Sequence, residues 1–416
     1  SAGALNNKAY AQFCSGYLES AIQGFQLALG MDSSLTVTRA NLIDALLQLE
    51  RFDDALYEAN WLATKGKDRI AGKLKLSRIY DHMGQQGRAL QEIYQALEID
   101  SKSIAVAGAC VTLTAYIGLD DELFAATKHF KSLAPSSVQL EWLESQVADF
   151  VGDYKLADSL LANISAASDL SGDVHFYAAT MAARRGDTER ALSLVDEAVQ
   201  SVGHQWNCLP LRWRLLVELG RNRKAIDWLD QLLAVCPSHP NALRLRALSA
   251  CVEDDHVTAQ GLLSRLPEDA TAKYRHFHFI IAYNAGRFDE AMAALAKLEQ
   301  NRSPGVDSLY RAAIHVRREH WKAAKRELDL AMRIGITGRI RESVIDMTDQ
   351  WQWLAGCHAH RAMLPDADRK AELAKAMEFY ELSMQAGHFT HRFAWFQPRL
   401  HPLREVPEFR RACGQA

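Results

Sequence analysis

The stretch MGQQGRALQEIYQALEID, residues 83–100, contains the pattern that decides the fold of this 416-residue chain. Gly84 stands five residues before the small residue Ala89, and apolar residues then follow at the i, i+3, i+4 and i+7 spacing of an amphipathic helix. A second helical segment, Lys73–Met83, precedes the glycine. The stretch therefore predicts two antiparallel helices, A and B, joined by a tight turn at Gly84.

The position of Ala89 recurs at a constant step through much of the chain. Its members are Ala21, Ala55, Ala89, Leu123, Ala157, Ala191, Ala225 and Ala259. Each of these residues follows the one before by the same step of about 34 residues, which we call the period. A step of this length is typical of helical-repeat arrays. Eight consecutive positions at the same step indicate internal repeats rather than independent domains. Small residues are favoured there because two helices pack closely only where about a methyl group separates their backbones. A single hairpin cannot bury its apolar face, so we expect the hairpins to stack into one continuous core.

Spacing and residue types resemble the tetratricopeptide repeat (TPR) family over roughly residues 2–333. The first unit has the family's small residues at Ala9, Ala21 and Ala28, with the aromatic Phe25 between the last two. The resemblance implies an all-α, right-handed superhelical solenoid of antiparallel helix hairpins, about ten to eleven units long, with a C-terminal cap. Leu123 and Trp213 depart from the pattern, because both occupy positions of small residues.

The sequence divides into three parts, which we predict as eight in-register repeats over 1–271, irregular TPR-like hairpins over 272–388 and a capping segment over 389–416. Pro267 shortens the eighth unit, and the next members of the small position, Ala291 and Ala324, follow at steps slightly shorter than the period. The ranges 338–363 and 367–386 each predict one longer helix. Terminal units of a solenoid are expected to be atypical.

The capping segment contains Leu403-Arg404-Glu405-Val406-Pro407-Glu408-Phe409. This run resembles the ending Leu-Arg-x-x-Pro-x-Phe of TPR regions in many bacterial multidomain proteins. In those proteins the array often follows a DNA-binding, cyclase or kinase domain. The chain also starts with small uncharged residues and no Met, which is typical of a cloning scar or of a cut made inside a longer protein.

Composition and charge exclude several classes of partner. The formal net charge is −3, so no global field recruits nucleic acid or anionic membrane. No apolar run approaches the ~18 residues that a membrane span needs, and we predict no membrane insertion. The seven cysteines never form Cys-x-x-Cys, which indicates reduced thiols and a cytoplasmic location.

Catalytic motifs are missing from the sequence: there is no phosphate-binding loop, no His-Glu-x-x-His and no Gly-x-Ser-x-Gly. Cys357 and His360 could face one ion, but a structural metal site needs four ligands, so we interpret them as a packed cysteine beside surface histidines. His276 and His278 diverge on one helix, beside the expected core residues Phe277 and Phe279. We predict a protein that is not an enzyme and has no metal or cofactor.

A basic stretch lies in the C-terminal third of the chain. It comprises Arg311, Arg317, Arg318, Lys322, Lys325 and Arg326. These residues are either a solvated helix face or a patch for an acidic partner. Aromatic residues are not interleaved with them, so nucleic acid is not favoured.

The resemblance further implies that helix A lines a concave groove and that its non-core positions contact ligands. The candidates are Asn6, Tyr10, Asn41, Asp44, Lys75, Arg78, Trp142, Gln146 and Arg184. One TPR subfamily clamps a C-terminal carboxylate with Lys and Asn residues, but Asn6 stands where that set has Lys. We therefore expect a ligand other than a chaperone tail, while each position alone could be a solvated helix face.

These observations favour a non-catalytic scaffold or adaptor that binds a protein or peptide partner in its groove. The alternative is the regulatory or sensor region of a larger bacterial signalling or transcription-regulator protein whose effector domain lies upstream of residue 1. An enzyme with a site assembled across the groove is the least favoured class. The sequence leaves open whether the protein forms homo-oligomers.

Overall fold

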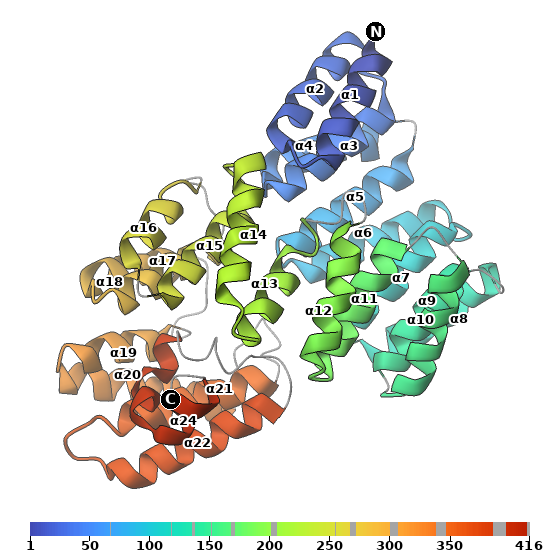
Figure 1. Ribbon diagram of the computed structural model, residues 1–416. Helices are drawn as coiled ribbons and strands as arrows, with labels where there is room; N and C mark the ends of the chain where they lie inside the picture. Colours follow the sequence, from blue (N-terminus) through green and yellow to red (C-terminus); the bar gives the residue numbers. More distant parts are fainter. Residues whose placement is uncertain are drawn as a thin grey trace. The chain divides into compact units, whose positions relative to one another are not determined.

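The computed structural model of the chain consists of helices throughout its described part (Figure 1). The described residues are 1–66, 68–117, 119–134, 138–150, 152–167, 171–200, 206–253, 255–266, 272–299, 307–337, 347–385 and 397–413. The chain divides into two compact units. The first comprises Ser1–Ala182, Arg190–Leu209 and Ala234–Pro240, and the second Ala183–Glu189, Pro210–Leu233 and Asn241–Ala416.

The helices B follow the period read from the sequence. They are α2 (Leu18–Met31), α4 (Phe52–Lys65), α6 (Gln86–Ile99), α8 (Asp120–Leu133), α10 (Tyr154–Ala167), α12 (Thr188–Gln200), α14 (Asn222–Val235) and α16 (His256–Leu263). Each of them begins one full period after the one before. The period predicted from the eight small positions is thus also the step between the first residues of successive helices B.

The helices A alternate with them. They are α1 (Ala2–Cys14), α3 (Thr36–Gln48), α5 (Arg69–His82), α7 (Ile104–Ile117), α9 (Val138–Phe150), α11 (Ser171–Arg184), α13 (Leu209–Glu218) and α15 (Pro240–Val252). Each of α1, α3, α5, α7 and α9 packs against its own helix B and also contacts the helix A of the adjacent hairpin. We call the surface formed by these five helices the A-surface of the first unit.

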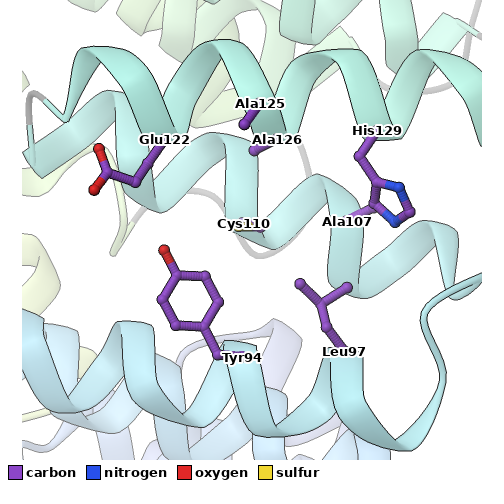
Figure 2. A pocket seen from close by; sticks show the side chains of 8 residues that line it. All are labelled: Tyr94, Leu97, Ala107, Cys110, Glu122, Ala125, Ala126 and His129. Carbon is purple, nitrogen blue, oxygen red and sulfur yellow. The ribbon is translucent and has the colours of Figure 1, made fainter.

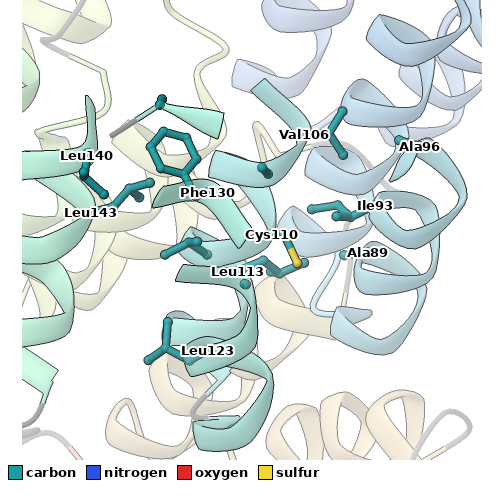
Figure 3. Packing of buried hydrophobic residues seen from close by; sticks show 14 residues of the cluster. Ala89, Ile93, Ala96, Val106, Cys110, Leu113, Leu123, Phe130, Leu140 and Leu143 are labelled. Atoms are coloured by element: carbon teal, nitrogen blue, oxygen red, sulfur yellow. The ribbon is translucent and has the colours of Figure 1, made fainter. Parts of the chain in front are cut away.

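The small position lies at the centre of each hairpin. All eight of its members are fully buried, at 0% exposure, including Leu123. In the third to fifth hairpins the buried side chains of α6, α7, α8 and α9 form one cluster, in which Ala89 and Phe130 both lie (Figure 3). Trp213 is buried as well, and its indole Nε1 donates a hydrogen bond to Ser249 Oγ at 2.9 Å. The stacked core expected from the sequence is confirmed for this part of the chain.

The turn between helix A and helix B needs a residue in the left-handed region. Gly84 has φ of 73°, and five other turn glycines have similar values. Glycine has no Cβ and adopts this conformation without steric cost. Glu50, with φ of 54°, and Glu319, with φ of 58°, occupy the equivalent position in two other hairpins. These two glutamates carry backbone strain that glycine would not.

The hairpins of the C-terminal region are less regular. They consist of α17 (Ala272–Asn284), α18 (Phe288–Glu299), α19 (Ser308–Arg317), α20 (Trp321–Thr337), α21 (Met347–Arg361) and α22 (Arg369–Gln385). Helix α16 has 8 residues, whereas α14 has 14, as expected for a shortened unit. Helix α18 begins slightly less than one period after α16, and α20 likewise after α18, as the sequence predicts.

The boundaries between the three predicted parts of the chain fall outside the described residues. The boundary near 271, with Pro267, lies outside them, and so does the boundary near 388. The longer helix expected over 338–363 corresponds to α21 from Met347, and 338–346 also lie outside the described residues. The helix expected over 367–386 is α22. The boundaries of the parts therefore stay a prediction.

The described part of the chain ends with a 3-10 helix, η1 (Pro398–Glu405), and a short helix, α24 (Pro407–Ala412). Leu403 and Phe409, the apolar residues of the ending motif, are fully buried. None of the described helices combines the length and apolar composition that crossing a membrane requires.

Candidate functional site

The 3-10 helix η1 lies on helices A of the second unit. It contacts α17, α19 and α21, and also α22. We call the surface of α17, α19 and α21 the A-surface of the second unit. The backbones approach closely at Gly356 of α21, where an added Cβ would lie 2.8 Å from Arg399 O. A segment of the chain thus runs across successive helices A.

Polar side chains of the helices A hold this segment. His360 of α21 has its ring Nε2 3.1 Å from Pro398 O, and Asn284 of α17 accepts a hydrogen bond from Arg404 at 2.9 Å. Arg399 donates to Gln352 Oε1. Each of these bonds joins η1 to α17 or α21. The A-surface of the second unit therefore binds backbone and side-chain groups of a 3-10 helical segment.

Two histidines at this contact are held neutral. Burial lowers the pKa of His360 to about 4, and a neutral ring with its proton on Nε2 donates to the carbonyl of Pro398. Burial, followed by the charges of Arg404 and Arg317, lowers the pKa of His401 to about 2. The neutral ring of His401 can then accept the hydrogen bond of the Arg317 guanidinium.

On the A-surface of the first unit, the structure brings several predicted groove residues together. Both carboxylate oxygens of Asp44 in α3 lie 2.7 Å from Lys75 Nζ in α5, and Arg78 NH1 lies 3.1 Å from the same carboxylate. The side chain of Arg78 stays 47% exposed. One carboxylate and two cations leave a net positive charge at the junction of α3 and α5.

Tyr10 of α1 borders this ion cluster. Its ring is 49% exposed, and its pKa is raised by its contact with Cys14, by burial and by the nearby charge of Asp44. Asn6, one turn earlier, donates to Asn7 Oδ1 at 3.3 Å and is half-buried, as is Asn41. The A-surface of the first unit therefore carries an exposed aromatic ring beside a cationic cluster.

The remaining groove candidates are placed differently. Trp142 of α9 packs against Tyr177 of α11, with ring centroids 6.2 Å apart, and is half-buried. Gln146 is only 8% exposed. The side chain of Arg184 lies outside the described residues. Trp142 and Gln146 are thus parts of the packing more than open ligand positions.

The basic stretch consists mainly of paired cations. Four of the six make ion pairs, which are Arg311–Glu327 at 3.0 Å, Arg318–Asp289 at 2.6 Å, Lys325–Asp366 at 2.7 Å and Arg326–Glu327 at 3.8 Å. Arg317 contacts His401 and lies over the ring of Phe288. Lys322 is exposed. These partners reduce the local positive field expected from the sequence.

The expectation of surface histidines beside Cys357 was wrong. His360 is fully buried, and His358 is 7% exposed with its Nδ1 2.6 Å from Glu372 Oε2. The reason is that α21 is covered by α20, α22 and η1. Cys357 is fully buried too, and burial raises its pKa.

A metal site has no support in the described part of the chain. There, no three His, Cys, Asp or Glu residues gather in a group that could hold an ion. His278 is half-buried, and its pKa is lowered by burial. The side chains of His276 and Phe277 lie outside the described residues, whereas Phe279 is fully buried as predicted.

A pocket that the sequence did not suggest lies between α6, α7 and α8 (Figure 2). It has a volume of about 230 Å³ and is lined by Tyr94, Leu97, Ala107, Cys110, Glu122, Ala125, Ala126 and His129. The ring of His129 is fixed at its edge, with Nε2 2.8 Å from Ser101 O. The residues that form this pocket come from two neighbouring hairpins.

The constant period and the stacked hairpins define a TPR-like helical-repeat protein. No family model matches the chain, and no curated protein matches it.

Similar solved structures include three helical-repeat proteins. The human IFIT1 dimer with m7Gppp-AAAA is 16% identical, with 92% of this chain and 90% of that chain covered and a TM-score of 0.43. A tetratricopeptide repeat protein from Parabacteroides merdae is 12% identical, with 70% and 98% covered and a TM-score of 0.32. PilF from Pseudomonas aeruginosa is 15% identical, with 47% and 90% covered and a TM-score of 0.36. At these values the likeness says nothing of what this chain binds.

Proposed function

We propose that this protein is a non-catalytic interaction scaffold that binds a segment of a protein partner on the A-surface of its first unit. The observation that carries the proposal is the position of η1. In the second unit, this segment of the chain itself lies across α17, α19 and α21. Helices A of this protein are therefore suited to accept a chain segment, and α1, α3 and α5 offer an equivalent surface.

The side chains of that surface suggest what the partner segment carries. Arg78 is half exposed and shares Asp44 with Lys75, so a carboxylate from the partner would meet a cluster with a net positive charge. Tyr10 offers a large ring with an exposed face for an apolar or planar group. We infer a partner segment that combines an acidic side chain with a neighbouring apolar one.

The test is partner capture by the full chain from cells that contain its natural partners, followed by mass spectrometry. We expect the triple variant Tyr10→Ala, Lys75→Ala, Arg78→Ala to lose partners that the unchanged chain retains. A matched control replaces exposed residues of helices B, Lys128→Ala with Arg223→Ala, and should retain them. Equal capture by the triple variant would contradict the proposal.

A second candidate rests on the C-terminal motif. The burial of Leu403 and Phe409 fits a segment that closes the array, as in the TPR regions of bacterial multidomain regulators. A regulatory or sensor region also works by binding, so both proposals use the same A-surface. The native gene upstream of Ser1 decides between them, because an effector domain encoded there would support the second.

The cellular compartment belongs to the same proposal. All seven cysteines are free thiols, and six of them are buried. Free buried thiols fit a reducing compartment, so we propose a cytoplasmic location.

A further inference from the structure

Two successive hairpins contain equivalent, partly buried ion pairs between helix A and helix B. Arg39 of α3 pairs with Glu58 of α4, and its guanidinium lies 3.9 Å from the ring centre of Trp61. The Arg39 side chain is 7% exposed and that of Glu58 17%. A cation from helix A therefore fills the space beside helix B in the second hairpin.

The third hairpin repeats this arrangement one period later. Lys73, at the position of Arg39, pairs with Glu92, at the position of Glu58, with Nζ and Oε2 2.8 Å apart. Lys73 Nζ also donates at 2.6 Å to Gln95 Oε1, at the position of Trp61. In both hairpins the cation of helix A therefore contacts a glutamate and one further side chain of helix B.

In the fourth hairpin the ion pair is replaced by alanines. One further period leads to Ala107, Ala126 and His129. All three line the pocket of about 230 Å³ between α6, α7 and α8 (Figure 2). The pocket exists because two methyl groups stand where the preceding hairpins have a long cation and a glutamate.

One end of the pocket is acidic. The Tyr94 hydroxyl points toward Glu122 in Figure 2. The pKa of Tyr94 is raised by burial and by the charges of Cys110 and Glu122. Glu122 is exposed and makes no ion pair within the described part of the chain. Leu97 and the alanines give the remainder of the pocket an apolar wall.

We propose that this pocket receives an arginine or lysine side chain from a partner protein, with its alkyl part on the alanines and its charge at Glu122 and Tyr94. Pockets for drug-sized ligands occupy about 300–1,000 Å³. This pocket, at about 230 Å³, is smaller, and its volume fits a single long side chain. The cation supplied by the partner takes the place of Arg39 and Lys73 in the preceding hairpins. The pocket shares no residue with the groove candidates, so this inference stands apart from the proposed function.

The probe is the peptide acetyl-Gly-Arg-Gly-amide, and its neutral counterpart carries citrulline, which has nearly the same shape without the charge. Binding to the full chain is measured by saturation-transfer difference NMR at millimolar peptide. We expect the arginine peptide to bind and the citrulline peptide to bind more weakly. Glu122→Gln should weaken the arginine peptide about two- to fivefold, as expected for an exposed ion pair.

The double variant Ala107→Lys, Ala126→Glu rebuilds the pair of Lys73 and Glu92 and fills the pocket. It should keep its helical circular dichroism and abolish binding of the arginine peptide. Equal binding of the arginine and citrulline peptides would overturn the proposal. Binding that survives in the folded double variant would do the same, and Glu122→Gln provides an independent test if that variant does not fold.

Discussion

The attachment of η1 to α21 leads to a prediction about a single methyl group. In Gly356→Ala, the new Cβ would lie 2.8 Å from Arg399 O and 3.0 Å from Leu309 Cδ2. The leucine methyl belongs to a side chain that can rotate, whereas the carbonyl belongs to the backbone of η1. The clash is therefore relieved most easily when η1 moves away from α21.

The magnitude follows from the two states that the substitution affects. Alanine stabilises a helix by about 1 kcal/mol relative to glycine. Because α21 stays helical whether η1 is attached or not, this gain is the same in the attached and the detached state and cancels. Overpacking costs about 1–3 kcal/mol and acts on the attached state alone. We expect the free energy of local detachment to fall by this amount, which raises the population of the detached state, and with it amide exchange, about 5- to 150-fold.

Hydrogen exchange measured by mass spectrometry checks this prediction. Peptides that cover residues 398–412 should exchange faster in Gly356→Ala, while α3 and α4 exchange at an unchanged rate. Gly261→Ala is the matched control, because its Cβ meets no atom within 4 Å and α16 should gain about 0.5–1 kcal/mol of stability. Unchanged exchange of 398–412 in Gly356→Ala would refute the close backbone contact.

Three further predictions concern the turns, the histidines and the buried ion pair. Glu50→Gly should stabilise the second hairpin by about 1 kcal/mol in urea unfolding, because glycine removes the strain of φ at 54°; a loss of stability would contradict the strained turn. In the folded protein the pKa of His360 is lowered from 6.5 to about 4. The neutral, buried ring therefore contributes its full stabilisation above pH 6.5, and this stabilisation is lost as the pH falls toward 4. Between pH 6.5 and 5 the unchanged chain should lose about 2 kcal/mol that His360→Asn does not lose, as measured by urea unfolding at each pH; parallel pH profiles would exclude this role. Arg39→Ala should cost about 3 kcal/mol, at the low end for a buried pair because the Glu58 side chain that keeps its charge is 17% exposed, and the double variant Arg39→Ala, Glu58→Ala should cost less than the two single losses together; additive losses in thermal unfolding would argue against the pairing.

The sequence predicts the fold well because its signal is periodic. The constant step from Ala21 to Ala259 matches the step between the first residues of the helices B. The turn at Gly84 was also readable, since a left-handed residue favours glycine. Glu50 adopts the same conformation without that signal, and its turn is closed by hydrogen bonds from the backbone N–H groups of Glu50 and Arg51 to Leu47 O and Leu46 O.

The candidate site was predictable only in part. Asp44, Lys75 and Arg78 share a face because their separations of 31 and 34 residues follow the repeat. The burial of Gln146 depends on packing that the period alone does not give. The burial of His360 depends on η1, which arrives 38 residues later in the chain. Ala107 and Ala126 look like ordinary small core residues until the ion pairs of the two earlier hairpins are known.

The constant step between the helices B also makes the array divisible. Adjacent hairpins contact mainly each other, so removal of one complete period would join two equivalent positions and leave a shorter stack with matching faces. A deletion of another length would rotate each later helix relative to its neighbour. Excision of residues 73–106 would place Ala107 directly after residue 72. The fourth hairpin, which has alanines in place of the ion pair, would then directly follow the hairpin that contains Arg39. Such a chain would present a surface one hairpin shorter, so the number of repeats would set the length of the partner segment that we propose it binds.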